Sequence, residues 1–151
     1  MKDGYGRSIE YLRISVTDRC NFRCVYCMPE SGMDWIPRDT VLSASEIQAV
    51  VLQLVPLGLR RIRITGGEPT LRRDLCDVIS RIHSLDGVED IALSTNGVKL
   101  EAMARELRAS GVVRVNISVD SLRPDRIASI ARRDLGLDPI RVIDAAIAAG
   151  F

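Results

Sequence analysis

The sequence predicts an α/β fold in which about four consecutive βα units build a parallel sheet. Three of four short segments alternate apolar and polar residues, as half-buried strands do. Stretches with helical periodicity separate these segments, and strands that alternate with helices are typical of βαβ units. The length of 151 residues suits a single domain with its own core. Together these observations indicate one parallel α/β domain.

The first half of the chain contains two of the expected units. A strand is expected at residues 12–16 (LRISV), followed by a long loop that carries three of the four cysteines. A helix is expected at 43–55, where the spacing of Ser43 and Glu46 predicts a capping box. The second strand, 61–65 (RIRIT), ends at the sequence GGEP, and a helix at 73–84 follows it.

The second half repeats this order. The third strand, 91–94 (IALS), ends at the turn sequence TNG, and a helix is expected at 100–110. The fourth strand, 113–119, ends at the sequence DS and precedes short helical stretches at 125–131 and 139–149. A fifth strand would be expected to begin just past Gly150, so the fourth strand is expected to leave an unpaired edge.

Composition narrows the class of protein. The chain is 46% hydrophobic and 27% charged, which argues against disorder. Because 21 Lys and Arg face 20 Asp and Glu, no basic field is present to favour nucleic acid or a membrane surface. The apolar stretch at 47–59 is interrupted by Gln48, Gln53 and Pro56, so no membrane partner is expected. The N-terminal residues lack the apolar core of a signal peptide, which predicts a cytoplasmic protein.

The cysteines form the most informative cluster. Cys20, Cys24 and Cys27 fall within eight residues, whereas Cys76 stands alone on the apolar face of an expected helix. Neither the predicted compartment nor the clustering favours disulfides. The alternatives are an iron–sulfur cluster on the three close cysteines and a closed zinc site with Cys76 as the fourth ligand. Cys76 is better suited to the role of a small buried apolar residue.

One face of the predicted sheet carries polar residues in the first, second and fourth strands. In the first two strands Arg13 and Arg63 lie opposite the apolar residues, although strands of a fully packed parallel sheet are apolar on both faces. Arginines that point into a lumen are costly unless an anion meets them. The face therefore either holds an anionic ligand or is simply solvated, and periodicity alone leaves both possibilities open.

The spacing of Cys20, Cys24 and Cys27 (CNFRCVYC) resembles the CxxxCxxC signature of the radical S-adenosylmethionine (SAM) superfamily. That resemblance implies a partial (βα) TIM-like barrel of the radical SAM type, with a [4Fe–4S] cluster on the three thiolates. Three ligands leave one iron of the cubane open, and in the family this iron binds SAM. One electron then cleaves SAM and releases a 5′-deoxyadenosyl radical.

The resemblance also implies residues that bind SAM. GGEP (residues 66–69) resembles the family segment beside the SAM amino group, which assigns Gly67 and Glu68 to SAM. Tyr26 matches a position near adenine, and Ser118 matches a position after the fourth strand that reaches SAM. Each residue also has a purely structural interpretation. GGEP could form an ordinary turn, Tyr26 could pack within the loop, and Ser118 could be a simple hydroxyl at a strand end.

Longer phrases resemble one family within the superfamily, the GTP 3′,8-cyclases. These are LRISVTDRCNFRCVYCMPE, RIRITGGEPTLRRDL, LSTNG and RVNISVDSL. The resemblance implies a lyase that converts GTP to 3′,8-cyclo-7,8-dihydroguanosine triphosphate in molybdenum cofactor biosynthesis. It assigns Arg13, Arg63 and Ser94 to GTP, although Ser94 could instead be a turn hydroxyl. The implied partners are a low-potential electron donor such as flavodoxin or ferredoxin and the next enzyme of molybdopterin synthesis.

The chain also departs from that family. Its members are about twice as long, and their C-terminal half supplies a second [4Fe–4S] cluster, further basic residues and a tail that ends in two glycines. Residues 1–151 are therefore expected to be the N-terminal part of a radical SAM core, open at its last strand and prone to aggregation. Two alternatives remain at this point. One is a radical SAM enzyme with another substrate, and the other is a non-catalytic module that binds a cluster or zinc.

Overall fold

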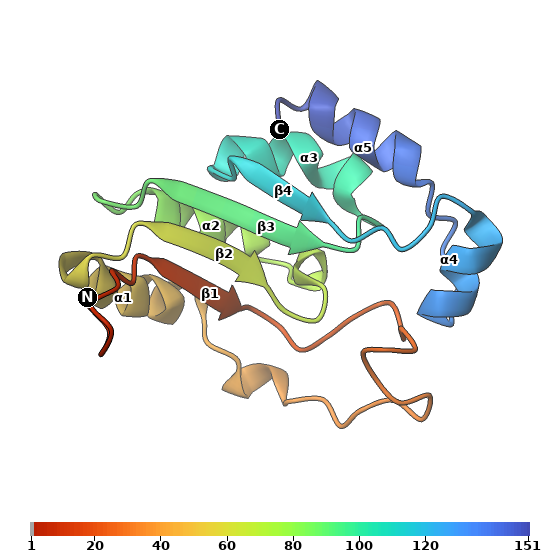
Figure 1. The fold of residues 1–151 in the computed structure, drawn as a ribbon, viewed down its shortest axis with the longest axis horizontal. Coiled ribbons are helices and arrows are strands. Elements are labelled where there is room, and N and C mark those ends of the chain that lie inside the picture. Colours follow the sequence, from red (N-terminus) through yellow and green to blue (C-terminus); the bar gives the residue numbers. More distant parts are fainter. Residues whose placement is uncertain (1) are drawn as a thin grey trace.

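A computed structural model describes residues 2–151 and confirms a parallel α/β fold (Figure 1). The strands are β1 (Tyr11–Ser15), β2 (Arg61–Thr65), β3 (Asp90–Thr95) and β4 (Arg114–Ile117). The α-helices are α1 (Ala44–Leu54), α2 (Leu75–His83), α3 (Leu100–Ser110), α4 (Pro124–Ala131) and α5 (Pro139–Ala148). Three 3₁₀ turns, η1 (Arg38–Thr40), η2 (Val55–Leu57) and η3 (Pro69–Leu71), complete the order. Each predicted strand and helix is present, with bounds that shift by up to two residues.

The strands lie in the order β1-β2-β3-β4, and all neighbours are parallel. Their carboxyl ends therefore meet at one edge of the sheet, where the loops after the strands gather. β4 pairs only with β3, so within residues 2–151 the predicted unpaired edge is observed. This arrangement is that of a partial barrel with four βα units.

Helices cover one face of the sheet and leave the other open. Figure 1 looks onto the open face, with α1 and α2 behind the strands. The covered face carries fully buried side chains of β2 and β3, with Ile64 and Leu93 at its centre. Leu75, Ile79 and Leu107 pack on them from the helices. Burying apolar surface at about 25 cal/mol per Å² makes this layer the main source of stability.

The helix boundaries follow local chemistry. Ser43 and Glu46 form the predicted capping box, in which the Ser43 hydroxyl accepts from the Glu46 amide and the Glu46 carboxylate accepts from the Ser43 amide at 2.8 Å. α5 begins with Pro139 in its first turn, where the carboxylate of Asp138 accepts from two backbone amides.

By length and composition alone, the segment Arg38–Leu57 would suffice to cross a membrane. In the structure this segment is broken into three helical pieces, and its one α-helix, α1, has 11 residues. A membrane-spanning helix needs about 20 residues. α1 also buries Ala44, Ile47 and Val51 in the core, so it acts as a layer helix of the sheet.

Candidate functional site

The predicted cluster-binding cysteines lie in the loop that follows β1, at the carboxyl edge of the sheet. Cys20 and Cys24 are partly buried and Cys27 is exposed, and all three are free thiols. A tight turn brings them together, because the amides of Cys27 and Met28 both donate to the carbonyl oxygen of Cys24, at 2.9 and 3.1 Å. The three thiols are thus presented by one short stretch of backbone.

A small apolar cluster anchors this loop to α4. Phe22, inside the cysteine motif, is buried against Ile127 and Ala131, and Cys20 and Cys24 pack at its margin. The end of α4 also accepts two hydrogen bonds from the loop backbone, from Arg23 to Ala131 at 2.8 Å and from Val25 to Ile130 at 3.0 Å. The last carbonyl groups of a helix have no partner within the helix. The amides of the cysteine loop supply donors to them at the end of α4.

Tyr26 connects the cysteine loop to the end of β4. Its hydroxyl donates to the Asp120 carboxylate at 2.8 Å, across 94 residues of sequence. This hydrogen bond, followed by partial burial and the neighbouring Cys24, raises the pKa of Tyr26 well above its ordinary value. Tyr26 as a residue is 66% exposed, which leaves it available to a ligand.

The GGEP segment touches the stretch that leads into the cysteine motif. The Gly67 amide donates to Thr17 and the Glu68 amide donates to Arg19, each at 2.7 Å. A Cβ atom at Gly66 or Gly67 would overlap the backbone of residues 17–19. Both glycines are therefore required by the close approach of the chain to its own backbone, a constraint that is separate from the predicted contact of Gly67 with SAM.

Glu68 is buried, with 1% of its surface exposed, and its carboxylate accepts four hydrogen bonds. The donors are the Thr70 amide at 3.0 Å, the Thr70 hydroxyl at 2.5 Å, the Thr95 hydroxyl at 2.7 Å and the Asn96 amide at 2.7 Å. A buried carboxylate is tolerated only when donors satisfy it in this way. Glu68 thereby ties the end of β2 to the end of β3.

The end of β3 also reaches the cysteine loop, because the Asn96 side-chain amide donates to Asn21 at 2.7 Å. The turn after β3 is closed by Thr95 and Asn96, whose side-chain oxygens accept from the amides of Gly97 and Val98. Ser94 is not the turn hydroxyl. It lies on the open face beside Asn116 of β4, and its hydroxyl makes no hydrogen bond within residues 2–151.

The donor set fits a [4Fe–4S] cluster better than zinc. Within residues 2–151, no three His, Cys, Asp or Glu side chains are placed to bind one metal ion. A cubane does not need that geometry, since each of its three cysteines binds a different iron. Cys76 packs against the main core from α2, whereas Cys20 and Cys24 contact the small cluster at α4. The structure does not bring Cys76 to the other three cysteines, so it speaks against the closed zinc site.

The surroundings raise the pKa of two of the three predicted ligand thiols, Cys20 and Cys24. Burial is the main cause that raises the pKa of Cys20, and the nearby Glu68 carboxylate adds to it. Burial likewise raises the pKa of Cys24, whereas a hydrogen bond with Tyr26 lowers it. Because metals bind thiolates, cluster assembly on these residues releases protons. For Cys76, burial and then Glu106 raise the pKa to about 11, as expected for an inert thiol.

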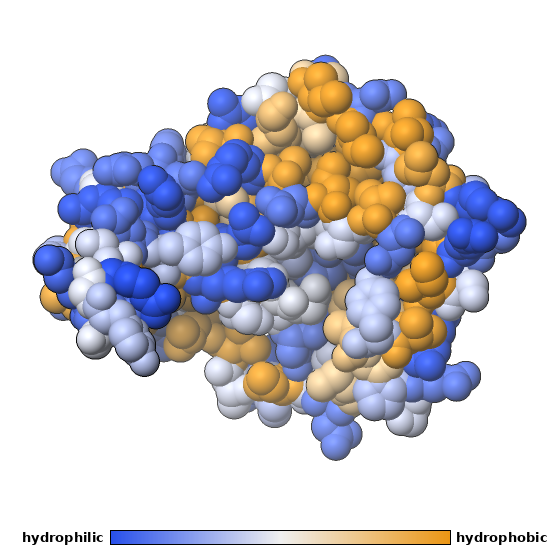
Figure 2. Space-filling model, viewed as in Figure 1, coloured by the Kyte–Doolittle hydropathy of each residue, from blue (hydrophilic) through white to orange (hydrophobic). Residues whose placement is uncertain are grey.

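Arg13 and Arg63 lie side by side on the open face. They are register partners on β1 and β2, so the parallel ladder places two positive side chains next to each other. Arg63 Nε is buried and has no hydrogen-bond partner within residues 2–151. On the same face Arg114 is neutralised by Asp90 at 2.5 Å. Figure 2, drawn from the same side, shows hydrophilic residues across this face and hydrophobic ones over α3 and α5.

Ser118 follows β4 at the same edge. Its side chain is exposed, and its amide donates to the Thr95 carbonyl oxygen at 2.9 Å, which extends the ladder by one residue. Ser118 thus lies between the end of β3 and Asp120, which holds Tyr26. The structure therefore gathers most of the predicted SAM residues around one edge of the sheet.

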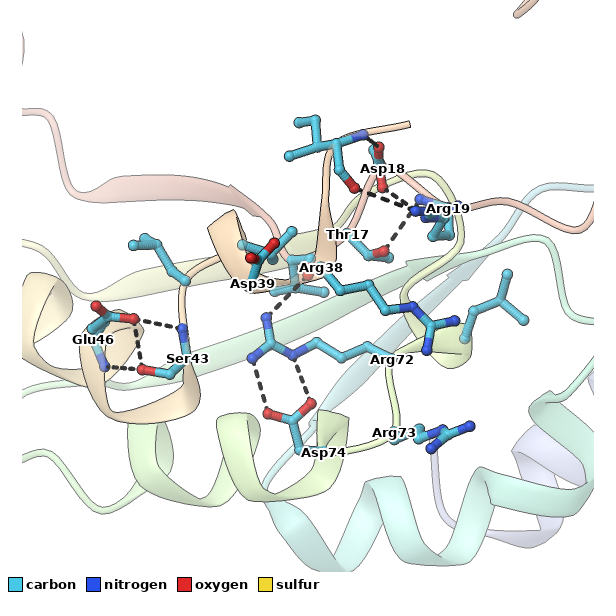
Figure 3. Close-up of a pocket in the computed structure, with 15 residues that line it drawn as sticks. Thr17, Asp18, Arg19, Arg38, Asp39, Ser43, Glu46, Arg72, Arg73 and Asp74 are labelled. Carbon is cyan, nitrogen blue, oxygen red and sulfur yellow. Dashed lines mark hydrogen bonds and ion pairs between the residues drawn. The ribbon is translucent and has the colours of Figure 1, made fainter. Parts of the chain in front are cut away.

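A cavity of about 430 Å³ lies to one side of this edge, between residues 16–19, the start of α1 and the start of α2 (Figure 3). None of the predicted site residues lines it. Two of its arginines form ion pairs within the wall, because Arg72 holds Asp74 at 2.9 Å and Arg19 lies 3.6 Å from Asp18. Arg72 also donates to the Val16 carbonyl oxygen at 3.0 Å. These contacts join the segment after β1 to the start of α2, and they make the cavity a weak candidate for binding a charged ligand.

The sequence interpretation missed the residues that position the cysteine loop. These are Asn21, Phe22, Thr95, Asn96 and Asp120. All but Phe22 are polar residues at strand ends or in the loop itself, and all five lie within the quoted phrases that resemble the family. Their partners are distant in sequence, so no local pattern could have paired them.

Comparison with known proteins identifies the family. The model of the radical SAM superfamily matches residues 14–151. Because this match covers most of the chain, the protein belongs to the radical SAM superfamily. The matched range begins in β1 and includes each strand-end segment described above.

Among curated relatives, the GTP 3′,8-cyclase of Ectopseudomonas mendocina is 52% identical over 149 residues, which cover 99% of this chain and 45% of that protein. The GTP 3′,8-cyclase of Pelotomaculum thermopropionicum is 45% identical over 165 residues, which cover 100% of this chain and 50% of that protein. The chain therefore spans about half the length of the curated relatives it matches.

Solved structures with this fold include SuiB of Streptococcus suis bound to S-adenosylmethionine, with a TM-score of 0.69 and 20% identity. That match covers 93% of this chain and 29% of SuiB. Methylornithine synthase (PylB) matches with a TM-score of 0.66 and 16% identity, over 93% of this chain and 42% of that chain. At these identities the likeness establishes the fold, a partial TIM-like barrel of the radical SAM type.

Proposed function

We propose that this radical SAM protein is the cluster- and SAM-binding part of a GTP 3′,8-cyclase, with residues 1–151 forming the N-terminal part of the radical SAM core. Curated relatives of that name are 45 to 52% identical to almost the whole chain. The observation that carries the proposal is the convergence on the cysteine loop. The ends of β2, β3 and β4 each hydrogen-bond to it, through Glu68, Asn96 and Asp120.

Cys20, Cys24 and Cys27 are the proposed ligands of a [4Fe–4S] cluster. When bound, this cluster supplies one electron that cleaves SAM to methionine and a 5′-deoxyadenosyl radical. The chain itself contributes three thiolates from one short loop, which α4 and the ends of β2, β3 and β4 hold in place. Such rigid support is what a metal site needs from the residues around its ligands.

Tyr26, Gly67, Glu68 and Ser118 are the proposed contacts to SAM. The exposed ring of Tyr26 suits adenine, because its hydroxyl is already fixed by Asp120. Since four donors occupy the Glu68 carboxylate, its main contribution would be to hold the GGEP backbone in place and to supply negative charge near an ammonium. Ser118 would present an exposed hydroxyl at the same edge.

Arg13, Arg63 and Ser94 are the proposed contacts to GTP. All three point from the open face of neighbouring strands, and the unpartnered Nε of Arg63 has capacity for an acceptor. Guanidinium groups bind phosphate oxygens through paired hydrogen bonds, so a triphosphate would relieve the repulsion between Arg13 and Arg63. The product would be 3′,8-cyclo-7,8-dihydroguanosine triphosphate, which the next enzyme of molybdopterin synthesis would consume.

A cytoplasmic location and a low-potential electron donor, a flavodoxin or ferredoxin, complete the proposal. Four free cysteines suit a reducing compartment.

The test is an anaerobic assay with this chain extended to the length of its relatives. Reconstituted protein, SAM and a reductant are expected to give 5′-deoxyadenosine, with formation of the cyclised nucleotide only when GTP is the substrate. Equal 5′-deoxyadenosine formation with other nucleotides or with peptides, and no cyclised product, would instead assign a different radical SAM reaction.

A further inference from the structure

A second cavity of about 430 Å³ lies on the outer side of the cysteine loop, next to the end of α4. Its walls carry three arginines, Arg23, Arg132 and Arg133, together with Trp35 and a single acidic residue, Glu30. Cations thus outnumber anions by three to one in this cavity, although the whole chain has a net charge of only +1. The proposed contacts to SAM and GTP do not line it.

Two of these arginines touch the backbone at either end of the cysteine motif. Arg23 Nη1 donates to the carbonyl oxygen of Cys20 at 2.7 Å. Arg132 Nη1 donates at 3.2 Å to the carbonyl oxygen of Met28, the residue that follows Cys27. An electron that arrives at this cavity therefore has a short path through the guanidinium group of Arg23 to a cluster ligand.

Arg132 is held in an unfavourable backbone conformation. Its φ of 50° is the only positive value for a non-glycine residue within residues 2–151. The position is the C-cap of α4, where glycine is the usual residue. Residues kept in sparsely populated conformations cluster at binding sites, because the surrounding structure must be arranged to hold them. The strained position of Arg132 thus places a second cation, in addition to Arg23, beside the motif.

The remaining features leave the positive charge accessible. The Arg23 guanidinium lies 5.0 Å from the centre of the Trp35 ring, which braces it in the cavity wall. Arg133 is exposed and makes no hydrogen bond or ion pair with any residue in the described part of the chain. Its charge is therefore available to a partner.

We propose that this cavity, with Arg23, Arg132 and Arg133, is the docking surface for an acidic protein that carries single electrons to the cluster. The inference rests on the proposed function, since only a redox cluster on these cysteines requires such a partner. One electron leaves the reduced carrier, which is oxidised, and enters the oxidised cluster, which is reduced, and no covalent bond changes. Small, charge-steered interfaces of this kind are typical of electron-transfer pairs.

Binding is tested first, with cluster-loaded chain and oxidised, dye-labelled flavodoxin as the acidic probe. Fluorescence anisotropy at low salt is expected to show that Arg133→Glu weakens the complex about fivefold or more, and that salt weakens the unmodified complex. Arg105→Glu is the matched control, because Arg105 is exposed on α3, away from the cavity. Equal affinity for Arg133→Glu and Arg105→Glu would overturn the inference.

Electron transfer is tested next, by following oxidation of reduced flavodoxin in a stopped-flow instrument. Arg133→Glu and the double variant Arg132→Gln/Arg133→Glu are expected to slow this step, whereas photoreduced deazaflavin, a small neutral reductant, should reduce the cluster of every variant equally. Loss of reduction by both reductants would show a damaged cluster loop, and the anisotropy result would then decide the docking inference alone. A chain that binds no reducible cluster would contradict the proposed function, and that failure is separate from a failure of docking.

Discussion

Arg13 and Arg63 are register partners on adjacent strands, and their side chains share the open face of the sheet. Neighbouring like charges on a sheet are destabilising, and the buried Nε of Arg63 adds an unsatisfied donor. Within residues 2–151, no acidic side chain pairs with either arginine. A protein tolerates such a pair where an anion completes the site, which makes this rung of the sheet the point where a triphosphate is expected.

The first prediction follows from this pair. Inorganic tripolyphosphate and GTP are expected to raise the melting temperature of the unmodified chain, and Arg13→Ala or Arg63→Ala should remove most of that increase. Arg61→Ala is the matched control, because Arg61 lies on the same strand and face but at the opposite end from the cysteine loop. Differential scanning fluorimetry makes the measurement. An undiminished increase in both variants would refute the anion site.

The second prediction concerns the contact between GGEP and the cysteine loop. Gly67→Ala is expected to lower the free energy of unfolding by about 2 kcal/mol, since its Cβ would overlap the backbone of Asp18 and Arg19. Iron incorporation should fall with it. Gly4→Ala is the control, because nothing lies within 4 Å of a Cβ at Gly4. Urea denaturation and iron analysis test both statements, and a Gly67→Ala protein as stable as Gly4→Ala would contradict them.

A third prediction separates two roles of Glu68. Glu68→Gln replaces one acceptor oxygen with an NH₂ group that faces hydrogen-bond donors, so the ligand-free chain should lose about 2 kcal/mol of stability. Thr70→Val, which removes only the hydroxyl donor of Thr70, should cost less. If Glu68 served SAM alone, the ligand-free variant would unfold at the same urea concentration as the unmodified chain, and only SAM binding would change.

The fourth prediction distinguishes the cysteines. Cys24→Ala is expected to prevent assembly of the cluster, because a cubane held by two thiolates is not retained. Cys76→Ala should keep the full iron content and lose only a modest amount of packing, since Cys76 contacts the main core. Iron and sulfide analysis after anaerobic reconstitution gives the answer. Equal iron losses in the two variants would contradict this distinction and favour a closed metal site that includes Cys76.

Much of the fold was predictable because its signals are local. The alternation of Leu12, Arg13 and Ile14 places β1, and the Ser43–Glu46 spacing places the start of α1. The open polar face also followed from periodicity, as did the position of the arginines on it. What was not predictable is which loop residues meet, because Tyr26 and Asp120 are 94 residues apart and their contact depends on the packing of the strands.

The neighbours of the GGEP segment were also beyond the reach of local sequence signals. From the sequence, two glycines indicate that something approaches the backbone closely, and a ligand was expected there. The structure shows that atoms of Thr17, Asp18 and Arg19 approach these glycines closely, while the contact of Gly67 with SAM stays a prediction. The pattern identified the steric requirement correctly, whereas the identity of the neighbour depended on the topology that brings β1 beside β2.

The central claim is that the cysteine loop forms a [4Fe–4S] site with one iron open to SAM. The most direct measurement is electron paramagnetic resonance of the chain after anaerobic reconstitution with iron and sulfide and then reduction, with and without SAM. A [4Fe–4S]⁺ signal that changes when SAM is added is the predicted result. A chain that takes up no cluster and instead binds about one zinc ion would contradict the claim.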